Sequence, residues 1–377
     1  MLESLYIKNY RNLKDISINS LGKVNLITGK NNTGKSTILE AIAIYATKVD
    51  LVLIYQLLGD RGENYRETEV NKNVTESNIR ALSSLFTNRN IRFEKEDAIL
   101  IGCIENTLFG EAKSSEKSVS IRFVKYIEEK QKEKQGNSFG ITRIILQDDD
   151  NKQLVNFKVG IEIRVGNINY ITTLEESQPY RFGYRGFGTN ENFQFIGTRN
   201  IDREINGKLW DKITLTENEN YVIEALKIIE PNTERIAFIE ENPRERTAVI
   251  KLSNATNVLP LLSMGDGINR ILTIILALVN SNNGILLIDE FENGLHYTVQ
   301  ERLWSMIFNL AKKLNVQVFV TTHSEDCISG FENILNNSEN TSDGKLIRLD
   351  NENGIIKQVE FNAKELKIAN EQNIDIR

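Results

Sequence analysis

Cysteine, histidine and proline are scarce in this chain, and long apolar runs are missing. Cys103 and Cys327 are its only cysteines, which excludes a disulfide framework or a cysteine-based zinc site and fits a reducing cytoplasm. With four prolines and 40% hydrophobic residues, the composition is that of a globular chain. The longest apolar stretch, at 271–279, is far below the roughly 20 residues of a membrane span. The first residues show no signal-peptide pattern, so we expect a cytoplasmic protein with no membrane partner.

An excess of positive charge is missing as well. The formal net charge is −6 and the pI is near 5.4. This balance disfavours nucleic-acid binding over the whole surface, but a local basic groove stays open because steering depends on how charge is distributed. Residues 180–188 (YRFGYRGFG) interleave aromatics with arginines and could stack on bases. A glycine-rich loop over a β lobe is the simpler interpretation.

Hydrophobic periodicity predicts an α/β chain, with strands and helices at both ends and a helical, then β-rich pattern in the middle. Residues 1–49 and 236–377 are expected to form one core, with a helical and β-rich insertion at 50–235, as the family resemblance given below implies. The short apolar runs without alternation are typical of buried strands in a mixed sheet flanked by helices. Within the core, strands are expected at 4–7, 15–18, 24–27, 236–239, 248–252, 285–288 and 316–320, and helices at 35–46, 266–280 and 297–314.

Residues 29–37 (GKNNTGKST) contain the phosphate-loop pattern G-x-x-x-x-G-K-[ST] in full, between a predicted strand and a predicted helix. Glycines let backbone N–H groups turn toward the phosphates, and the helix N-terminus adds partial positive charge. The Lys35 ammonium can contact the β- and γ-phosphates, and the Ser36 hydroxyl can bind Mg²⁺. A chance turn is the alternative, which the flanking strand and helix disfavour. The expected ATP-binding residues are Gly29, Asn31, Asn32, Thr33, Gly34, Lys35, Ser36 and Thr37.

A second apolar strand, at 285–288, ends in two carboxylates, Asp289 and Glu290. At the carboxyl end of such a strand Asp289 can support the Mg²⁺ shell, and Glu290 can orient or deprotonate the attacking water. A solvated acidic turn is the alternative for the strand taken alone. The presence of a phosphate loop in the same chain favours the functional interpretation.

Two other polar segments follow the same logic. The strand at 316–320 leads to His323, whose imidazole could donate a hydrogen bond near a γ-phosphate, although a lone histidine is more often a structural partner. Residues 263–267 (SMGDG) open an apolar helix and could bind an anion, with a simple N-cap turn as the alternative. Cys327 follows His323 at a spacing of four, but two ligands make a poor zinc site, so no metal is expected there.

In its order of phosphate loop, signature, acidic strand and histidine loop, the chain resembles the ABC-type ATPase heads of the SMC and RecF group. It is similar in particular to the OLD-like AAA ATPases often encoded in bacterial phage-defence loci. Residues 6–12 with the phosphate loop, and roughly 255–330, carry the resemblance. It implies an ABC/SMC-type P-loop ATPase head, with Lys35 and Ser36 on phosphate and Mg²⁺, Asp289 on Mg²⁺ and Glu290 as the catalytic carboxylate.

The resemblance further implies a homodimer or higher oligomer with composite ATP sites. Ser263 and Gly265 would contact the γ-phosphate of a partner protomer, His296 would lie in a loop that crosses the interface, and His323 would be the switch residue. Less directly, it implies that Arg11 and Asn12 lie near the α-phosphate, and Gln194 is a candidate for the glutamine loop. The signature differs from the transporter form Ser-Gly-Gly-Gln, which argues against a transport motor. The toprim nuclease of full OLD proteins is missing.

These patterns together predict an ATP-hydrolysing, dimerising switch that regulates or assembles a separate effector, a nuclease or toxin, in anti-phage defence. The last step rests on the resemblance alone. A RecF-like DNA-binding repair or clamp ATPase is the alternative, and an ATP-binding scaffold with negligible turnover is a third possibility. Binding of DNA is therefore left open by the sequence.

Overall fold

The computed structural model describes residues 1–63, 74–105, 113–132, 139–146, 157–175, 192–198, 203–242, 245–336, 343–372 and 376. The chain divides into two compact units. Unit 1 contains Met1, residues 20–39 and residues 190–377, and unit 2 contains residues 2–19 and 40–189. The segment at 180–188, considered above for stacking on bases, lies outside the described residues.

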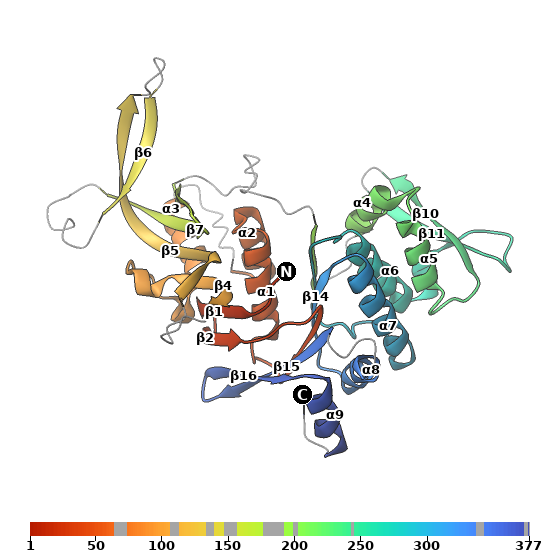
Figure 1. Ribbon diagram of the computed structural model, residues 1–377. Helices are drawn as coiled ribbons and strands as arrows, with labels where there is room; N and C mark the ends of the chain where they lie inside the picture. The colour runs from red at the N-terminus through yellow and green to blue at the C-terminus, as the bar shows by residue number, and fades with distance from the viewer. Residues whose placement is uncertain are drawn as a thin grey trace. The chain divides into compact units, whose positions relative to one another are not determined.

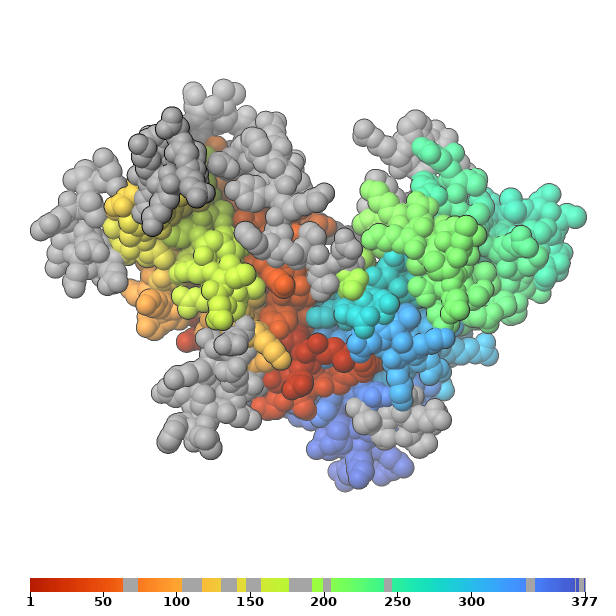
Figure 2. Space-filling model, turned by 45° about the horizontal axis from the view of Figure 1, so that its top comes forward, coloured from red at the N-terminus to blue at the C-terminus, as the bar shows by residue number. Residues whose placement is uncertain are grey.

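Unit 1 is built on a six-stranded mixed sheet of order β16-β15-β3-β14-β13-β9. All neighbours pair in parallel except β15 and β16, which are antiparallel. Because β3 pairs with both β14 and β15, segments from the two ends of the chain lie side by side, as the red and blue parts of Figures 1 and 2 show. The strands are β3 (Val24–Gly29), β9 (Phe193–Ile196), β13 (Ile285–Ile288), β14 (Gln317–Thr321), β15 (Gly344–Glu352) and β16 (Ile355–Phe361).

The central strands are mostly apolar because both sheet faces are covered. Every residue of β3, β13 and β14 is buried, and strands rich in apolar residues are typical of parallel sheets under helices. The helices of unit 1 are the start of α1 (Lys35–Ala46), α4 (Arg203–Ile213), α5 (Asn218–Leu226), α6 (Asp266–Val279), α7 (Tyr297–Lys313), α8 (Glu325–Leu335) and α9 (Ala363–Glu371). A small sheet is formed by β10 (Thr233–Asn242), β11 (Glu245–Leu252) and β12 (Leu259–Pro260).

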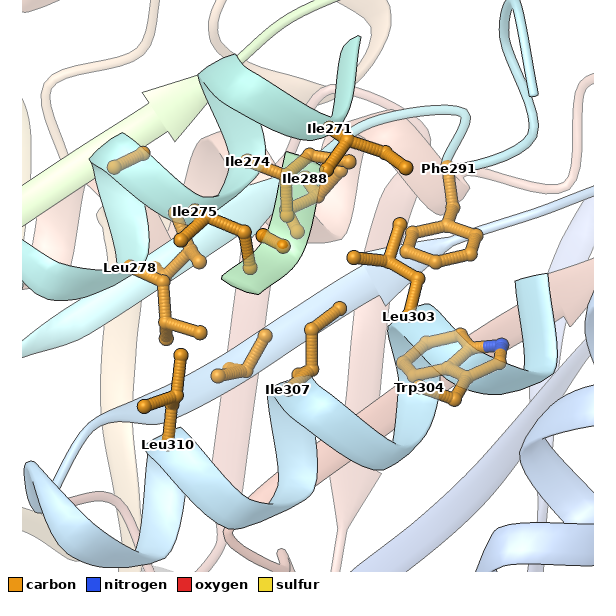
Figure 3. Close-up of a cluster of buried hydrophobic side chains, with 14 of the residues drawn as sticks. Ile271, Ile274, Ile275, Leu278, Ile288, Phe291, Leu303, Trp304, Ile307 and Leu310 are labelled. Carbon is orange, nitrogen blue, oxygen red and sulfur yellow. The ribbon is translucent and has the colours of Figure 1, made fainter. Parts of the chain in front are cut away.

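The core of unit 1 centres on α6, which is buried from Ile268 to Val279 on all sides. Most of these buried residues are apolar, as is typical of a helix inside a protein. Each fully buried Ile or Leu side chain contributes about 1.5–3 kcal/mol relative to exposure. Phe291 stacks on Trp304 with ring centroids 4.4 Å apart. Figure 3 shows how α6, α7 and β13 meet through the side chains of Ile271, Ile274, Ile275, Leu278, Ile288, Leu303, Ile307 and Leu310.

Unit 2 is a seven-stranded antiparallel sheet with short helices. Its strand order is β2-β1-β4-β5-β7-β8, and β6 pairs with β5. The strands are β1 (Leu5–Tyr10), β2 (Leu13–Ile18), β4 (Ile99–Glu105), β5 (Lys113–Lys132), β6 (Phe139–Ile145), β7 (Lys158–Val165) and β8 (Ile168–Thr173). The part of α1 from Glu40 onward, α2 (Leu51–Asp60), α3 (Val74–Ser83) and the 3-10 turns Thr87–Arg89 and Lys95–Asp97 complete the unit.

The expected α/β fold with a mixed sheet flanked by helices is confirmed, but the units divide the chain at other residues than 49/50 and 235/236. Strand pairing explains the difference. β1 pairs with β4, which ties the N-terminal hairpin to the middle of the chain, and β9 pairs with β13, which adds residues after 190 to the nucleotide sheet. None of the helices in the described part of the chain is both long and apolar enough to cross a membrane.

Candidate functional site

The phosphate loop connects β3 to α1 inside unit 1, as the motif predicted. Gly29 has a φ of 138°, and a Cβ there would lie 2.4 Å from the carbonyl oxygen of Leu349 and 2.7 Å from Oγ1 of Thr33. A side chain is therefore excluded by sterics as well as by φ. Thr33 closes the turn by donating its hydroxyl to the carbonyl of Lys30 at 2.8 Å. The turn leads directly into α1, whose N-terminal N–H groups can bind an anion.

Lys35 lies at the start of α1 with its ammonium folded over this loop. Its Nζ donates to the carbonyls of Gly29 at 2.7 Å and Lys30 at 2.9 Å. Burial lowers the pKa of Lys35 to about 8, while the carboxylates of Asp289 and Glu290 act in the opposite direction. Desolvation disfavours a charged amine, and a nearby anion restores its charge. A phosphate bound beside Lys35 would therefore favour its charged form.

Asp289 follows β13 and lies 7% exposed at the carboxyl edge of the sheet. Its Oδ1 accepts the hydroxyl of Ser36 at 3.0 Å and the hydroxyl of Thr321 at 2.6 Å. The strands β3, β13 and β14 are parallel, so their carboxyl ends deliver these three residues to one place. Ser36 and Asp289, the two residues expected to hold Mg²⁺, are thus hydrogen-bonded to each other, and their binding of the metal stays a prediction.

Glu290 comes next and adopts a left-handed backbone, with φ at 50°. Its N–H donates to Oγ1 of Thr321 at 2.9 Å, and its Oε2 accepts the amide of Asn293 at 2.8 Å. Arg270, from the α6 helix, donates through Nη2 to the carbonyls of Asp289 and Glu290, both at 2.9 Å. A non-glycine residue with positive φ is held there by its surroundings and is frequent at functional sites.

His323 lies two residues beyond the end of β14, at the same sheet edge, and is exposed. Its backbone N–H donates to Oε1 of Glu292 at 2.7 Å, while Oε2 of that carboxylate accepts the hydroxyl of Thr322 at 2.7 Å. The Glu292 side chain thus positions the segment that carries the imidazole. The assignment of His323 to a γ-phosphate remains a prediction.

The signature residues lie at the start of α6. Ser263 is part of a 3-10 turn (Leu261–Met264), is exposed, and donates its hydroxyl to the carbonyl of Pro260 at 2.7 Å. Gly265, with φ at 97°, is the N-cap residue and makes no side-chain cap. The turn thus supplies the N-cap of α6, as the simpler alternative expects, and binding of an anion there stays a prediction. His296 caps α7, with its Nδ1 2.9 Å from Oγ1 of Thr298, and remains exposed.

Arg11 and Asn12, which the resemblance places near an α-phosphate, belong to unit 2. Arg11 belongs to unit 2, where its Nε is 3.0 Å from Glu40 and its Nη1 is 2.7 Å from Glu63, with 7% of the side chain exposed. Its Nη2 is buried without a hydrogen-bond partner among the described residues. Asn12 lies exposed in the turn between β1 and β2. Contact of either with an α-phosphate stays a prediction.

Gln194 lies within β9, in register with Leu286, and not in a loop after the strand. Three further candidate site residues, Thr321, Arg270 and Asn293, were not predicted from the sequence. Each of them bonds to Asp289 or Glu290. The polar residues at the end of β14 were a visible signal for Thr321. No local sequence pattern predicts Arg270 or Asn293, because their hydrogen bonds to Asp289 and Glu290 form only in the tertiary structure.

The chain is similar in sequence to known proteins. A relative from Helicobacter pylori described as an "ATP/GTP phosphatase" is 24% identical over 404 residues, covering 99% of this chain and 100% of that protein. An uncharacterized protein of Methanocaldococcus jannaschii is 36% identical over 107 residues, covering 28% of this chain and 92% of its own length.

Solved structures similar to the chain include SMC head domains. The head domain from Pyrococcus furiosus, bound to the C-terminal domain of ScpA, has a TM-score of 0.48 at 13% identity and covers 99% of both chains. The head domain from Thermotoga maritima has a TM-score of 0.42 at 12% identity and covers 96% of this chain and 99% of its own. A family model described as "AAA domain, putative AbiEii toxin, Type IV TA system" matches residues 24–326. The chain, a P-loop ATPase by its motif and its sheet, belongs to that family.

Proposed function

We propose that unit 1 binds ATP with Mg²⁺ at the phosphate loop and hydrolyses it, with Glu290 as the residue that activates water. The observation that carries the proposal is the convergence of Ser36 and Thr321 on Oδ1 of Asp289, at 3.0 and 2.6 Å. Residues from three separate strand ends meet there, beside the buried ammonium of Lys35. Phosphoryl transfer is catalysed chiefly by such positioning and by charge.

The donor set fits a magnesium ion. Mg²⁺ takes oxygen ligands and keeps several waters, so it needs only one or two protein oxygens. The Ser36 hydroxyl and the Asp289 carboxylate, 3.0 Å apart, would hold it, directly or through water. When bound, Mg²⁺ neutralises charge on the β- and γ-phosphates. Lys35 would contact the same phosphates, and Glu290 would hold the proton removed from the attacking water.

The proposal includes dimerisation. The signature turn is exposed at Ser263, and the helix N-terminus at Gly265 has no side-chain cap, so its N–H groups are available to an anion. A bound triphosphate already has one such cradle in the phosphate loop. In a two-fold dimer the second turn would meet the nucleotide of the opposite protomer, giving two composite sites with His296 in the crossing loop and His323 at the γ-phosphate.

ATP-dependent dimerisation would act as a switch on a separate effector. The family description names a toxin of a type IV toxin–antitoxin system. That description and the sequence resemblance support a role in anti-phage defence, in which the ATP state restrains or assembles a toxin or nuclease encoded nearby.

Two variants test the catalytic assignment. Lys35→Ala is expected to weaken ATP binding, because it removes the charge at the phosphates. Glu290→Gln is expected to bind ATP normally and turn over at least about 100-fold more slowly, the scale of a lost general base. Turnover is measured by phosphate release and binding by calorimetry. Native turnover in Glu290→Gln would refute its role.

Mixing two inactive variants tests the composite site. Lys35→Ala damages one half of the site and Ser263→Arg the other, so a mixed dimer contains one site with both halves intact. Free exchange of subunits would make about half the dimers mixed and about a quarter of all sites intact. Partial recovery of activity on mixing supports the shared site. Full activity of Ser263→Arg alone, with a monomeric mass in ATP, would refute it.

A further inference from the structure

A cavity of about 470 Å³ lies in unit 1 beside the start of α6. Its walls come from α4, from β10 and β11, from the first turns of α6 and from the loop after β13. Figure 1 shows α4, β10, β11 and α6 close together in unit 1. Leu262 and Asp266 line the cavity but Ser263 and Gly265 do not, so the cavity adjoins the turn assigned above to a partner's nucleotide without containing those two residues. Its volume is in the range of ligand pockets, about 300–1,000 Å³.

A polar stripe on an otherwise apolar helix forms one wall of this cavity. Asp266, Asn269 and Arg270 line it, and Thr273 continues the same face of α6 at the i, i+3, i+4, i+7 spacing. Asn269, Arg270 and Thr273 are each at most 9% exposed. Buried polar side chains cost free energy unless they have hydrogen-bond partners, so each should be accounted for.

One acceptor among these buried side chains, Oδ1 of Asn206, lacks a hydrogen-bond partner in the described residues. The hydroxyl of Thr273 donates to the carbonyl of Asn269 at 3.0 Å, so it must accept from Asn206, whose Nδ2 lies 2.8 Å away. This fixes the orientation of the Asn206 amide. Its Oδ1 then has no hydrogen-bond partner among the described residues, although the side chain is 5% exposed and lines the cavity.

One buried donor, Nε of Arg270, also lacks a hydrogen-bond partner in the described residues. Arg270 is 4% exposed and lines the cavity, and its Nη2 bonds to the carbonyls of Asp289 and Glu290. Its Nε has no partner within the described part of the chain. An unpaired buried donor or acceptor destabilises the folded chain. A ligand that offers one donor to Asn206 and one acceptor to Arg270 would recover both.

The remaining walls are mixed. Phe238, Ala248, Leu262 and Leu272 contribute apolar surface, and Thr198, Arg246 and Thr247 contribute polar groups, with the Arg246 guanidinium 5.8 Å from the centre of the Phe238 ring. A flat ligand with a donor beside an acceptor on its edge matches such a mixture of apolar and polar groups. Nucleobases have this pattern, and proteins recognise unpaired bases by contact with apolar rings and by hydrogen bonds to the base edge.

Two residues that line the cavity also bond to Glu290. Arg270 and Asn293 both line it, and they bond respectively to the main-chain carbonyl and the Oε2 of Glu290. A ligand that displaced either side chain would break its hydrogen bond to Glu290. Two sites joined by a shared element are coupled only if the occupant favours one arrangement of that element.

We propose that this cavity is an effector site for a nucleobase, bound by Asn206 and Arg270 and separate from the phosphate loop. Its occupancy changes ATP turnover through Arg270 and Asn293, a part of the inference that rests on the proposed ATPase function. Binding at the cavity does not depend on that function and is tested by itself.

The binding test uses the full chain saturated with Mg²⁺ and a non-hydrolysable ATP analogue, so that the phosphate-loop site is filled. Adenosine, guanosine, cytidine and uridine are each titrated by calorimetry. At least one is expected to bind, at least about tenfold more weakly in Asn206→Leu, which loses the acceptor. Asn220→Leu, an exposed asparagine on α5, is the matched control and should bind as the native chain does.

Phe238→Leu, which alters the apolar wall, provides a second variant if Asn206→Leu unfolds, and weaker binding is again expected. Absence of binding by all four nucleosides would overturn the site, as would binding that neither variant weakens. The coupling is tested by the effect of the bound nucleoside on ATP turnover of the native chain. A change that Asn206→Leu abolishes supports it, and unchanged turnover despite binding refutes the coupling alone.

Discussion

The side-chain amide of Asn293 donates to Oε2 of Glu290 at 2.8 Å. Two residues separate them, and the loop that contains all four connects β13 to α7. Through this bond Asn293 would be a positioning residue for the proposed general base. A mechanism that needs an oriented carboxylate depends on such a contact.

Removing this contact should slow chemistry more than binding. We expect Asn293→Ala to lower kcat by about tenfold with little change in KM for ATP, since one hydrogen bond to a charged group is lost. Steady-state phosphate release measures both quantities. Asn282→Ala, an exposed asparagine before β13, is the control and should behave as the native chain does. A rise in kcat for Asn293→Ala would mean that the contact restrains Glu290.

Thr321 should govern how well the site holds magnesium. Its hydroxyl donates to Asp289 and accepts the N–H of Glu290. Thr321→Val keeps the shape but removes both bonds, so we expect the Mg²⁺ concentration for half-maximal turnover to rise about tenfold and the free energy of unfolding to fall by about 1–3 kcal/mol. Turnover against Mg²⁺ and urea unfolding measure these. Thr214→Val, at an exposed position, is the control, and equal behaviour of both variants would contradict the role of Thr321.

The lowered pKa of Lys35 predicts proton uptake when ATP binds. At a pKa of about 8 the free lysine loses its charge as the pH rises through 8, and a nearby triphosphate raises the pKa again. Binding should therefore take up part of a proton at pH 8–9 and almost none from this residue at pH 6, and affinity should fall as pH rises through this range. Calorimetry in buffers of different ionisation enthalpy measures the uptake.

Two lysine variants make that measurement specific. Lys35→Arg stays charged throughout and should show no uptake at pH 8–9, while Lys30→Ala, an exposed lysine of the same loop, should keep it. Identical uptake in Lys35→Arg and the native chain would assign the proton to another group.

An added methyl group should lower the free energy of unfolding more at Gly29 than at Gly354. Both have positive φ, at 138° and 83°, but only Gly29 has neighbours within 4 Å of an added Cβ, the nearest 2.4 Å away. We expect Gly354→Ala to lower the free energy of unfolding by about 1–2 kcal/mol from φ alone. Gly29→Ala should cost more than 4 kcal/mol, beyond most single substitutions. Urea unfolding compares them, and equal losses would show that the loop can move away from β15.

The local sequence determined the elements and the chemistry at their ends. The G-x-x-x-x-G-K-[ST] spacing specifies a strand, a turn and a helix start, and the apolar run before Asp289 specifies a buried strand, because sterics and burial act over neighbouring residues. The observed β3, α1, β13 and β14 follow these expectations within one or two residues.

Only the tertiary structure decided which distant residues meet. The register of β3 with β14 and of β13 with β14 brings Ser36, Asp289 and Thr321 together across more than 250 positions of sequence. The pairing of β1 with β4 and of β9 with β13 moved the boundaries of the two units, and the packing of α4 on α6 created the cavity at Asn206. Such contacts depend on long-range pairing and side-chain packing, which no local pattern encodes.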